Sequence, residues 1–232
     1  MTGGWSGARE PVNASHLERR LPPVLSVIAG MVDVIGFLSL GLFTAHVTGN
    51  LVVIAVQLVR GGPPHLAPIL AVPVFIVAVT AAWLIAKASG RRGPALLRPL
   101  LLVQFLLLAG VLILSVVGDP ASNRHGLITG VTAMIAVSAM GCQFGLLRLA
   151  LTGAPSTAVM TGNVTNTVLA LLDALSRTQP LTAGANERVK RPLEVLVGFF
   201  AGCLAGATAV SFLGDWAWAL PVVLAAAAVA LR

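Results

Sequence analysis

Charge is scarce in this sequence. Only 10% of its 232 residues are Asp, Glu, Lys or Arg, and 57% are hydrophobic, whereas soluble domains have about 25% and about 45–50%. The mean hydropathy is +0.93. Since only helices and closed barrels can satisfy their backbone hydrogen bonds inside lipid, long apolar runs predict an all-α polytopic membrane protein. The lipid bilayer is therefore its first expected partner.

Other residue types and motifs are also missing. Tyr is absent, and the basic residues lie between apolar runs, so nucleic acid is not expected as a partner despite the net charge of +7. The two cysteines, Cys142 and Cys203, lie in separate apolar segments without CxxC or Cys/His spacing. We therefore expect neither a disulfide nor a metal site. No nucleotide-binding loop occurs, so no cofactor and no direct use of ATP are expected.

The apolar runs predict six membrane-spanning helices, each close to the ~20 residues that a bilayer requires. The polar residues 1–20 are predicted to form a cytoplasmic tail, and the run after them is too long for a signal peptide. The first membrane repeat then covers 21–118 and the second covers 127–232. The expected spans are 21–42, 66–86, 99–118, 127–147, 193–213 and 216–231, of which the last is short.

A small polar triplet occurs twice. "HVTGN" covers 46–50 and "VMTGN" covers 159–163, and each is followed by an apolar segment that reaches only about half of the bilayer. Threonine, glycine and asparagine suit helix N-termini and sharp bends, so each triplet predicts a half-helix or re-entrant segment that begins near mid-membrane. Simple helix capping is the alternative. The candidate substrate-pathway residues are Thr48, Gly49, Asn50, Thr161, Gly162 and Asn163.

The distribution of basic residues favours six spans over eight. With six spans and an inner N-terminus, only Arg60 and Arg124 of the 15 Lys and Arg residues fall outside. If both TGN segments crossed, the basic cluster at 87–98 would lie outside. Both termini are then cytoplasmic, and the two three-helix halves have opposite orientations. Inverted repeats with interrupted helices are typical of secondary transporters.

Asp33 lies near the middle of the first predicted span, where an ionisable residue is costly and indicates function. We expect it to couple transport to protons or a cation; a hydrogen-bonded structural acid is the alternative. His46 is a second candidate for proton coupling. "AGMVD" (29–33) and "AMGCQ" (139–143) precede the two triplets, and an insertion of three residues aligns Asp33 with Gln143. Gln143 is expected to orient the carboxylate or bind substrate.

Three glycines, Gly198, Gly202 and Gly206, share one helix face in the span 193–213. Small residues at this spacing let helix backbones pack closely. The contact can lie inside the bundle or join two copies in a homo-oligomer.

The stretches "AGMVDVIGFLSLGLFTAHVTGN", "AMGCQ" and "VMTGNVTN" resemble the YoaK-like family of bacterial integral membrane proteins, a domain of unknown function. The resemblance covers the chain from about residue 21 to its end. It implies a multi-pass protein of the bacterial inner (plasma) membrane and supplies no substrate.

These features favour a small secondary transporter or permease for an unidentified small molecule or ion. A passive channel and a protein with only an assembly role are the alternatives. An enzyme is not expected, because the four histidines (positions 16, 46, 65 and 125) are not clustered and Asp33 has no second acid in the membrane spans.

Overall fold

The computed structural model describes residues 12–60, 66–118, 126–157, 159–176 and 183–231. Within these ranges every regular element is helical, as the composition predicts. A π-helical turn η1 extends the first helix, and two 3-10 turns, η2 and η3, precede α4 and α8. The elements are α1 (Val12–Ile35), η1 (Gly36–Leu40), α2 (Gly49–Arg60), α3 (Leu66–Ser89), η2 (Gly93–Leu96), α4 (Leu97–Gly118), α5 (Leu127–Ala150), α6 (Met160–Ser176), α7 (Ala183–Leu213), η3 (Gly214–Trp218) and α8 (Ala219–Ala230).

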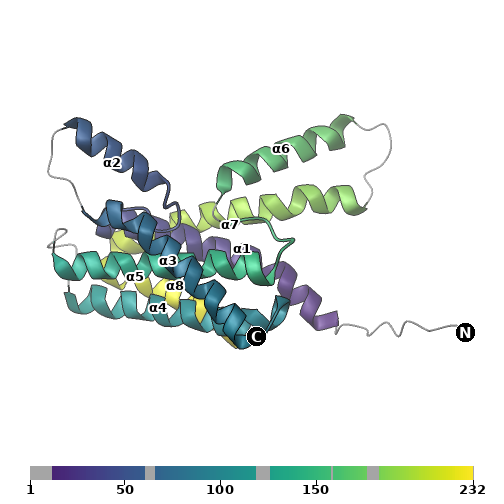
Figure 1. Cartoon of the computed structure of the whole chain (residues 1–232). Helices are drawn as coiled ribbons and strands as arrows, with labels where there is room; N and C mark the ends of the chain where they lie inside the picture. Colours follow the sequence, from purple (N-terminus) through teal and green to yellow (C-terminus); the bar gives the residue numbers. More distant parts are fainter. Residues whose placement is uncertain (1–11, 61–65, 119–125, 158, 177–182, 232) are drawn as a thin grey trace, which may run out of the picture.

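Five helical segments in the described residues are long and apolar enough to span a membrane. Four of them match predicted spans, and the fifth, Val189–Ala230, contains the last two predicted spans together. Gly214 interrupts this segment with φ of +55°, a conformation that glycine adopts without strain. The chain reverses there, and α8 runs back along α4 (Figure 1). The 12 residues of α8 and the 5 of η3 together reach about 28 Å.

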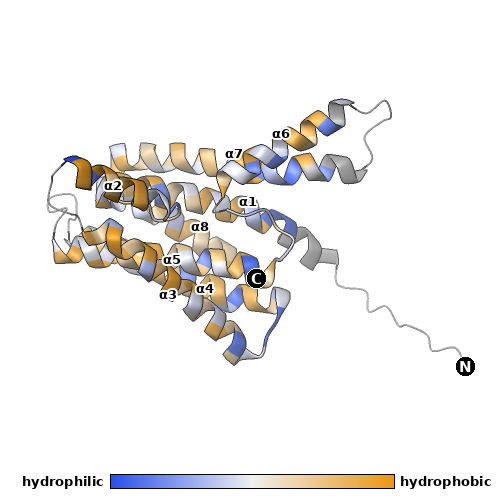
Figure 2. Ribbon diagram, turned by 45° about the horizontal axis from the view of Figure 1, so that its top comes forward, coloured by the Kyte–Doolittle hydropathy of each residue, from blue (hydrophilic) through white to orange (hydrophobic). Residues whose placement is uncertain are grey.

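Six helices form a bundle, and α2 and α6 lie along one side of it (Figure 1). The helices α1, α4 and α7 begin at one end of the bundle, where α3, α5 and α8 finish. We call this the basic end, because Lys87 and Arg148 lie in the last turns of α3 and α5 and Arg98 lies in the first turn of α4. Figure 2 shows hydrophilic helix turns at this end. Arg60, the last residue of α2, lies at the opposite end.

The two expected repeats are packed against each other. Helices of the first half pack mainly on helices of the second: α1 on α7, α3 and α4 on α5, and α4 on α8. Within the segment expected as the polar tail, α1 begins at Val12. Residues 1–11 lie outside the described part of the chain.

The glycine face of α7 packs against α1. A Cβ atom added at Gly202 would overlap the carbonyl oxygen of Val27, and one added at Gly30 would overlap that of Phe199. At Gly206 the same atom would lie 3.0 Å from the Met31 carbonyl oxygen. Gly198 faces the Pro23 carbonyl oxygen in the same way. The expectation of a homo-oligomer through Gly198, Gly202 and Gly206 is therefore wrong for this face, because α1 of the same chain already covers it.

The first span covers Arg19–Leu40, two residues earlier than the expected 21–42 and of the same length of 22 residues. After the π-helical turn, Gly41 adopts φ of +76° and stops the helix. The chain then returns through residues 41–48 to the start of α2. The two helices that follow the triplets differ in length: α2 has 12 residues and α6 has 17, about 18 Å and 26 Å. The second helix is thus longer than the expected half-bilayer segment.

Candidate functional site

Asp33 lies in the last turn of α1 and holds the returning loop. Its Oδ1 accepts hydrogen bonds from the backbone N–H groups of Thr44 (2.9 Å), Ala45 (2.8 Å) and His46 (3.2 Å). The carboxylate is 5% exposed. Backbone N–H groups that no helix pairs are costly away from water, so one oxygen atom satisfies three donors that the break between α1 and α2 leaves open.

The second carboxylate oxygen, Oδ2, binds His46, the other candidate for proton coupling. The Nδ1 atom of His46 lies 2.8 Å from Asp33 Oδ2, and the His46 side chain is 30% exposed whereas that of Asp33 is 6% exposed. The imidazole also packs edge-on against Phe199 of α7, with ring centroids 5.0 Å apart. Two residues singled out separately in the sequence therefore form one acid–imidazole pair, of which the histidine is the accessible member.

Asn50 closes the same loop from the other side. Its Oδ1 accepts from the Phe43 N–H (2.9 Å) and its Nδ2 donates to the Phe43 carbonyl (2.8 Å). The Asn50 side chain is buried. The sequence predicted an N-cap for α2 here, but Asn50 lies within the first turn of that helix and reaches back seven positions to fix the loop.

The second triplet repeats this contact. Asn163 Nδ2 donates to the Ser156 carbonyl at 2.7 Å, again across seven positions. Thr157, which corresponds to Thr44, is fully buried, as Thr44 is. In each loop an asparagine side chain thus donates to a backbone carbonyl seven positions before it, and a threonine is buried.

The repeated motif is longer than the triplet on which the sequence analysis relied. Residues 44–50 read "TAHVTGN" and residues 157–163 read "TAVMTGN". The shared T-A-x-x-T-G-N pattern would have identified Thr44 and Thr157, which the analysis missed. Both threonines mark the point where a loop is anchored to the preceding span.

Gln143 occupies the place in α5 that Asp33 occupies in α1. Its Nε2 lies 3.4 Å from Thr157 Oγ1, a separation of 14 positions, and Asp33 binds Thr44 across 11. The two separations differ by three positions, which is the length of the insertion expected from the sequence. Gln143 also donates to the Leu25 carbonyl (2.9 Å) and accepts from Gln104 Nε2 (2.7 Å). Within the described residues Gln143 makes no hydrogen bond to Asp33, so the structure gives no support to the orienting role, and substrate binding stays a prediction.

The remaining triplet residues are more accessible. Thr48 and Thr161 are exposed, and Gly49 and Gly162 are partly exposed, whereas Asn50 and Asn163 are buried. A Cβ atom at Gly49 would lie 3.0 Å from the Phe43 ring, which the glycine avoids. In both views α2 and α6 begin near each other, over the middle of α1 and α7, and diverge toward opposite ends of the bundle (Figures 1 and 2).

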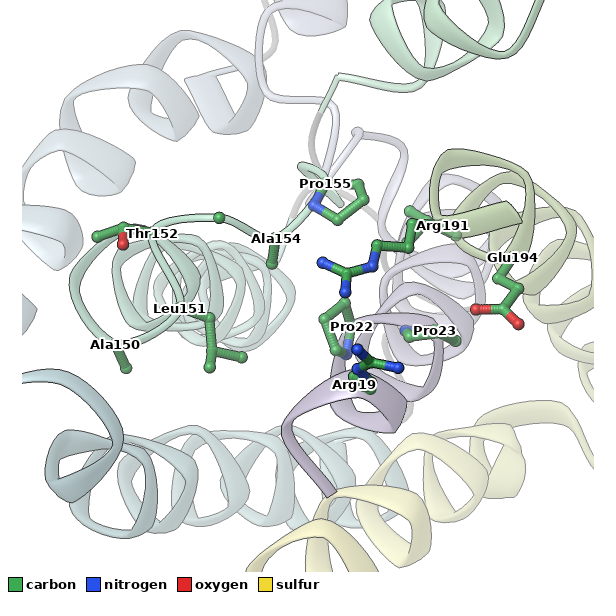
Figure 3. Close-up of a pocket in the computed structure, with 12 residues that line it drawn as sticks. Arg19, Pro22, Pro23, Ala150, Leu151, Thr152, Ala154, Pro155, Arg191 and Glu194 are labelled. Atoms are coloured by element: carbon green, nitrogen blue, oxygen red, sulfur yellow. The ribbon is translucent and has the colours of Figure 1, made fainter. Parts of the chain in front are cut away.

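A cavity of about 520 Å3 adjoins the second triplet, and Ser156, Gly162, Asn163 and Asn166 contribute to its lining. A second cavity, of about 360 Å3, lies between the N-terminal part of α1, the start of α7 and the loop that follows α5 (Figure 3). In the part of the chain that the structure describes, no group of three or more His, Cys, Asp or Glu residues is placed to hold a metal ion. Cys142 and Cys203 are free thiols.

The comparisons with known proteins agree with the expected family resemblance. A search of curated proteins found no match, and a search of solved structures found none. The family described as "Protein of unknown function (DUF1275)" matches residues 21–231. That range covers the helical bundle from residue 21 of α1 onward, including both T-A-x-x-T-G-N loops and Asp33. The chain therefore belongs to this family of proteins of unknown function.

Proposed function

We propose that the chain is a secondary transporter or permease for a small molecule or ion, with a substrate pathway between the starts of α2 and α6. The observation that carries this proposal is the pair of matching loops, each closed by an asparagine that reaches back seven positions. Interrupted helices whose N-termini meet near the middle of a bundle are the usual substrate-binding device of such proteins.

The proposal includes an inverted repeat, which the pattern of helix contacts supports. If α1–α4 correspond to α5–α8, the contact of α1 with α7 has its counterpart in that of α5 with α3. The contact of α2 with α3 corresponds to that of α6 with α7, and that of α4 with α5 to that of α8 with α1. With three crossings in each half, the halves are oppositely oriented, which gives six spans in all. Two such halves can rock about a shared central site.

The direction of the half-helices fits the same scheme. α2 runs from the middle toward the opposite end, and α6 runs from the middle toward the basic end (Figure 1). By the positive-inside rule the basic end is cytoplasmic, so both termini lie on the cytoplasmic side of a plasma membrane. Thr48, Gly49, Thr161 and Gly162 then contribute the accessible polar surface of the pathway. The hydrogen bonds of Asn50, Asn163 and Gln143 stabilise the segments that surround it.

The Asp33–His46 pair is the proposed site of proton coupling. The imidazole is 30% exposed and lies 2.8 Å from a buried carboxylate, so it is placed to exchange a proton with the proposed pathway.

A passive facilitator is the second candidate. Asp33 already accepts three backbone hydrogen bonds in addition to the histidine contact. A carboxylate held in this way can serve only to fix the loop, in which case the pathway conducts solute without coupling.

The test is flux through proteoliposomes that contain the purified chain and a pH-sensitive dye. Solute-dependent proton movement in the wild type, together with its loss in His46→Gln while downhill solute flux persists, would support coupling by the pair. Glutamine can still donate to Asp33 but cannot carry a proton. Asp173→Asn, which changes an exposed acid of α6, is the control. Solute flux without proton movement in the wild type would identify the facilitator, and no flux of any tested solute class would refute transport.

A further inference from the structure

The two cavities near the second triplet share one wall. Gly153, Ala154, Pro155 and Arg191 line both the 360 Å3 cavity and the 520 Å3 cavity. The larger cavity extends to Gly162 and Asn163 in the first turn of α6. The two cavities are therefore adjacent, and together they extend from the basic end of the bundle to the second T-A-x-x-T-G-N loop; we call the pair the hollow.

Three arginines from three different helices line this hollow. Arg19 comes from α1, Arg148 from the last turn of α5 and Arg191 from α7. In Figure 3 the side chain of Arg191 lies beside Pro155 and that of Arg19 beside Pro22, and the carboxylate of Glu194 points away from them. Each cavity is lined by two of these arginines, Arg19 and Arg191 in the smaller and Arg148 and Arg191 in the larger.

The acidic groups nearby leave positive charge uncompensated. Glu187 binds Arg191 at 2.9 Å, and Glu194 lies 3.8 Å from Lys190 on the same helix. Among the described residues Arg19 and Arg148 have no acidic partner within ion-pair distance. The hydrogen bond from Arg191, with smaller contributions from the charges of Arg19 and Lys190, holds the pKa of Glu187 below its ordinary value. The surroundings of the hollow are thus net positive.

We propose that this hollow is a binding site for a small oxyanion, of phosphate or carboxylate type. Guanidinium groups bind such anions through paired, charge-assisted hydrogen bonds. The first turn of α6, whose Gly162 and Asn163 line the inner end, adds the positive end of a helix dipole. On the proposed transport function, the substrate is then an anion that reaches the second loop from the cytoplasmic side.

Two kinds of ligand carry such an oxyanion: a free solute and the phosphate group of an anionic lipid. Equilibrium binding separates them and needs no transport. The full chain in neutral detergent is titrated with inorganic phosphate and with succinate at constant ionic strength, and the midpoint of thermal unfolding is followed. In parallel, nanodiscs of phosphatidylcholine with and without phosphatidylglycerol are analysed for lipid that remains bound after extraction.

The variants are Arg148→Gln, Arg191→Lys and the double variant Arg148→Gln/Arg191→Gln. Arg98→Gln is the matched control, because it removes an exposed positive charge at the same end without lining either cavity. The side chain of Arg148 makes no ion pair in the described residues, so its replacement leaves the fold intact even if the double variant fails to fold.

Saturable binding of phosphate or succinate, weakened at least tenfold in the double variant, severalfold in Arg148→Gln and unchanged in Arg98→Gln, would support a free anion. Retention of phosphatidylglycerol by the wild type and its loss in Arg148→Gln would support the site with a lipid as its occupant. Absence of all three interactions, or equal weakening by Arg98→Gln, would overturn the proposal. Because no gradient is used, these outcomes are independent of whether the transport assay succeeds.

Discussion

At the scale of single residues, Asp33 connects a helix break to a titratable group. Three backbone N–H donors converge on one of its oxygens and a histidine binds the other. The same carboxyl group therefore fixes the loop and holds the histidine next to the proposed pathway.

Replacement of Asp33 by asparagine should lower the free energy of unfolding by about 2–3 kcal/mol, because hydrogen bonds to a charged group are lost or weakened. Thermal unfolding of the purified chain measures this change. Asp173→Asn should leave the midpoint unchanged, since that side chain is exposed on α6. Equal midpoints for the wild type and Asp33→Asn would mean that the carboxylate does not hold the loop.

Glu187 should compete with a bound anion for Arg191. Its pKa is lowered chiefly by the hydrogen bond from Arg191, so the ion pair is present above the ordinary Glu value of 4.5 and is lost as the pH falls through the lowered pKa. Sulfate, which stays fully ionised over this range, should therefore bind with constant affinity between about pH 8 and 5 and more tightly at lower pH.

In Glu187→Gln, sulfate affinity should be higher and should no longer rise at low pH. Titrations followed by thermal unfolding compare the two proteins. A variant that binds no more tightly than the wild type at pH 7 would show that Arg191 does not face the anion.

At the scale of elements, the contact between α1 and α7 determines the position of the Asp33–His46 pair. The two backbones approach so closely that Gly30 and Gly202 leave no room for a Cβ atom, and Phe199 of α7 then reaches His46. The sequence predicted the glycine face from its spacing. It could not predict the partner, because an identical face would suit a second copy of the chain.

Gly202→Ala should destabilise the chain by about 1–3 kcal/mol, the usual cost of overpacking, and should weaken the proton coupling by displacing α7 from His46. Gly130→Ala is the control: it lies in α5 with no atom within 4 Å of an added Cβ, and should stabilise the helix by up to about 1 kcal/mol. The measurement is the unfolding midpoint of each variant. Tolerance of alanine at Gly202 would show that the two helices are less closely packed than described.

At the scale of the whole molecule, the proposed orientation places Arg60 and Arg98 on opposite sides of the membrane. In a background with Cys142 and Cys203 replaced by alanine, a membrane-impermeant maleimide should label Arg60→Cys in intact cells. Arg98→Cys should react only after the membrane is opened. Labelling of both from outside would require an even number of crossings between α2 and α4 and would therefore contradict the assignment of α3 as a single span.

Much of the architecture follows from the sequence alone. The lengths of the apolar runs specify the spans, because unpaired backbone groups are too costly in lipid, and all six predicted runs are helical. The repeated triplet indicated two matched loops, and the charge asymmetry indicated which end is basic. These signals are local, so they can be read one segment at a time.

Only the tertiary structure decided what the polar residues do. Gln143 could not be assigned from its own segment, since its partners include the Leu25 carbonyl, 118 positions away. The arginines of the hollow come from α1, α5 and α7 and converge only when the bundle is assembled. A buried polar side chain takes whichever partner the packed helices bring within hydrogen-bond distance, and that choice depends on close packing between distant segments rather than on the residue's neighbours in sequence.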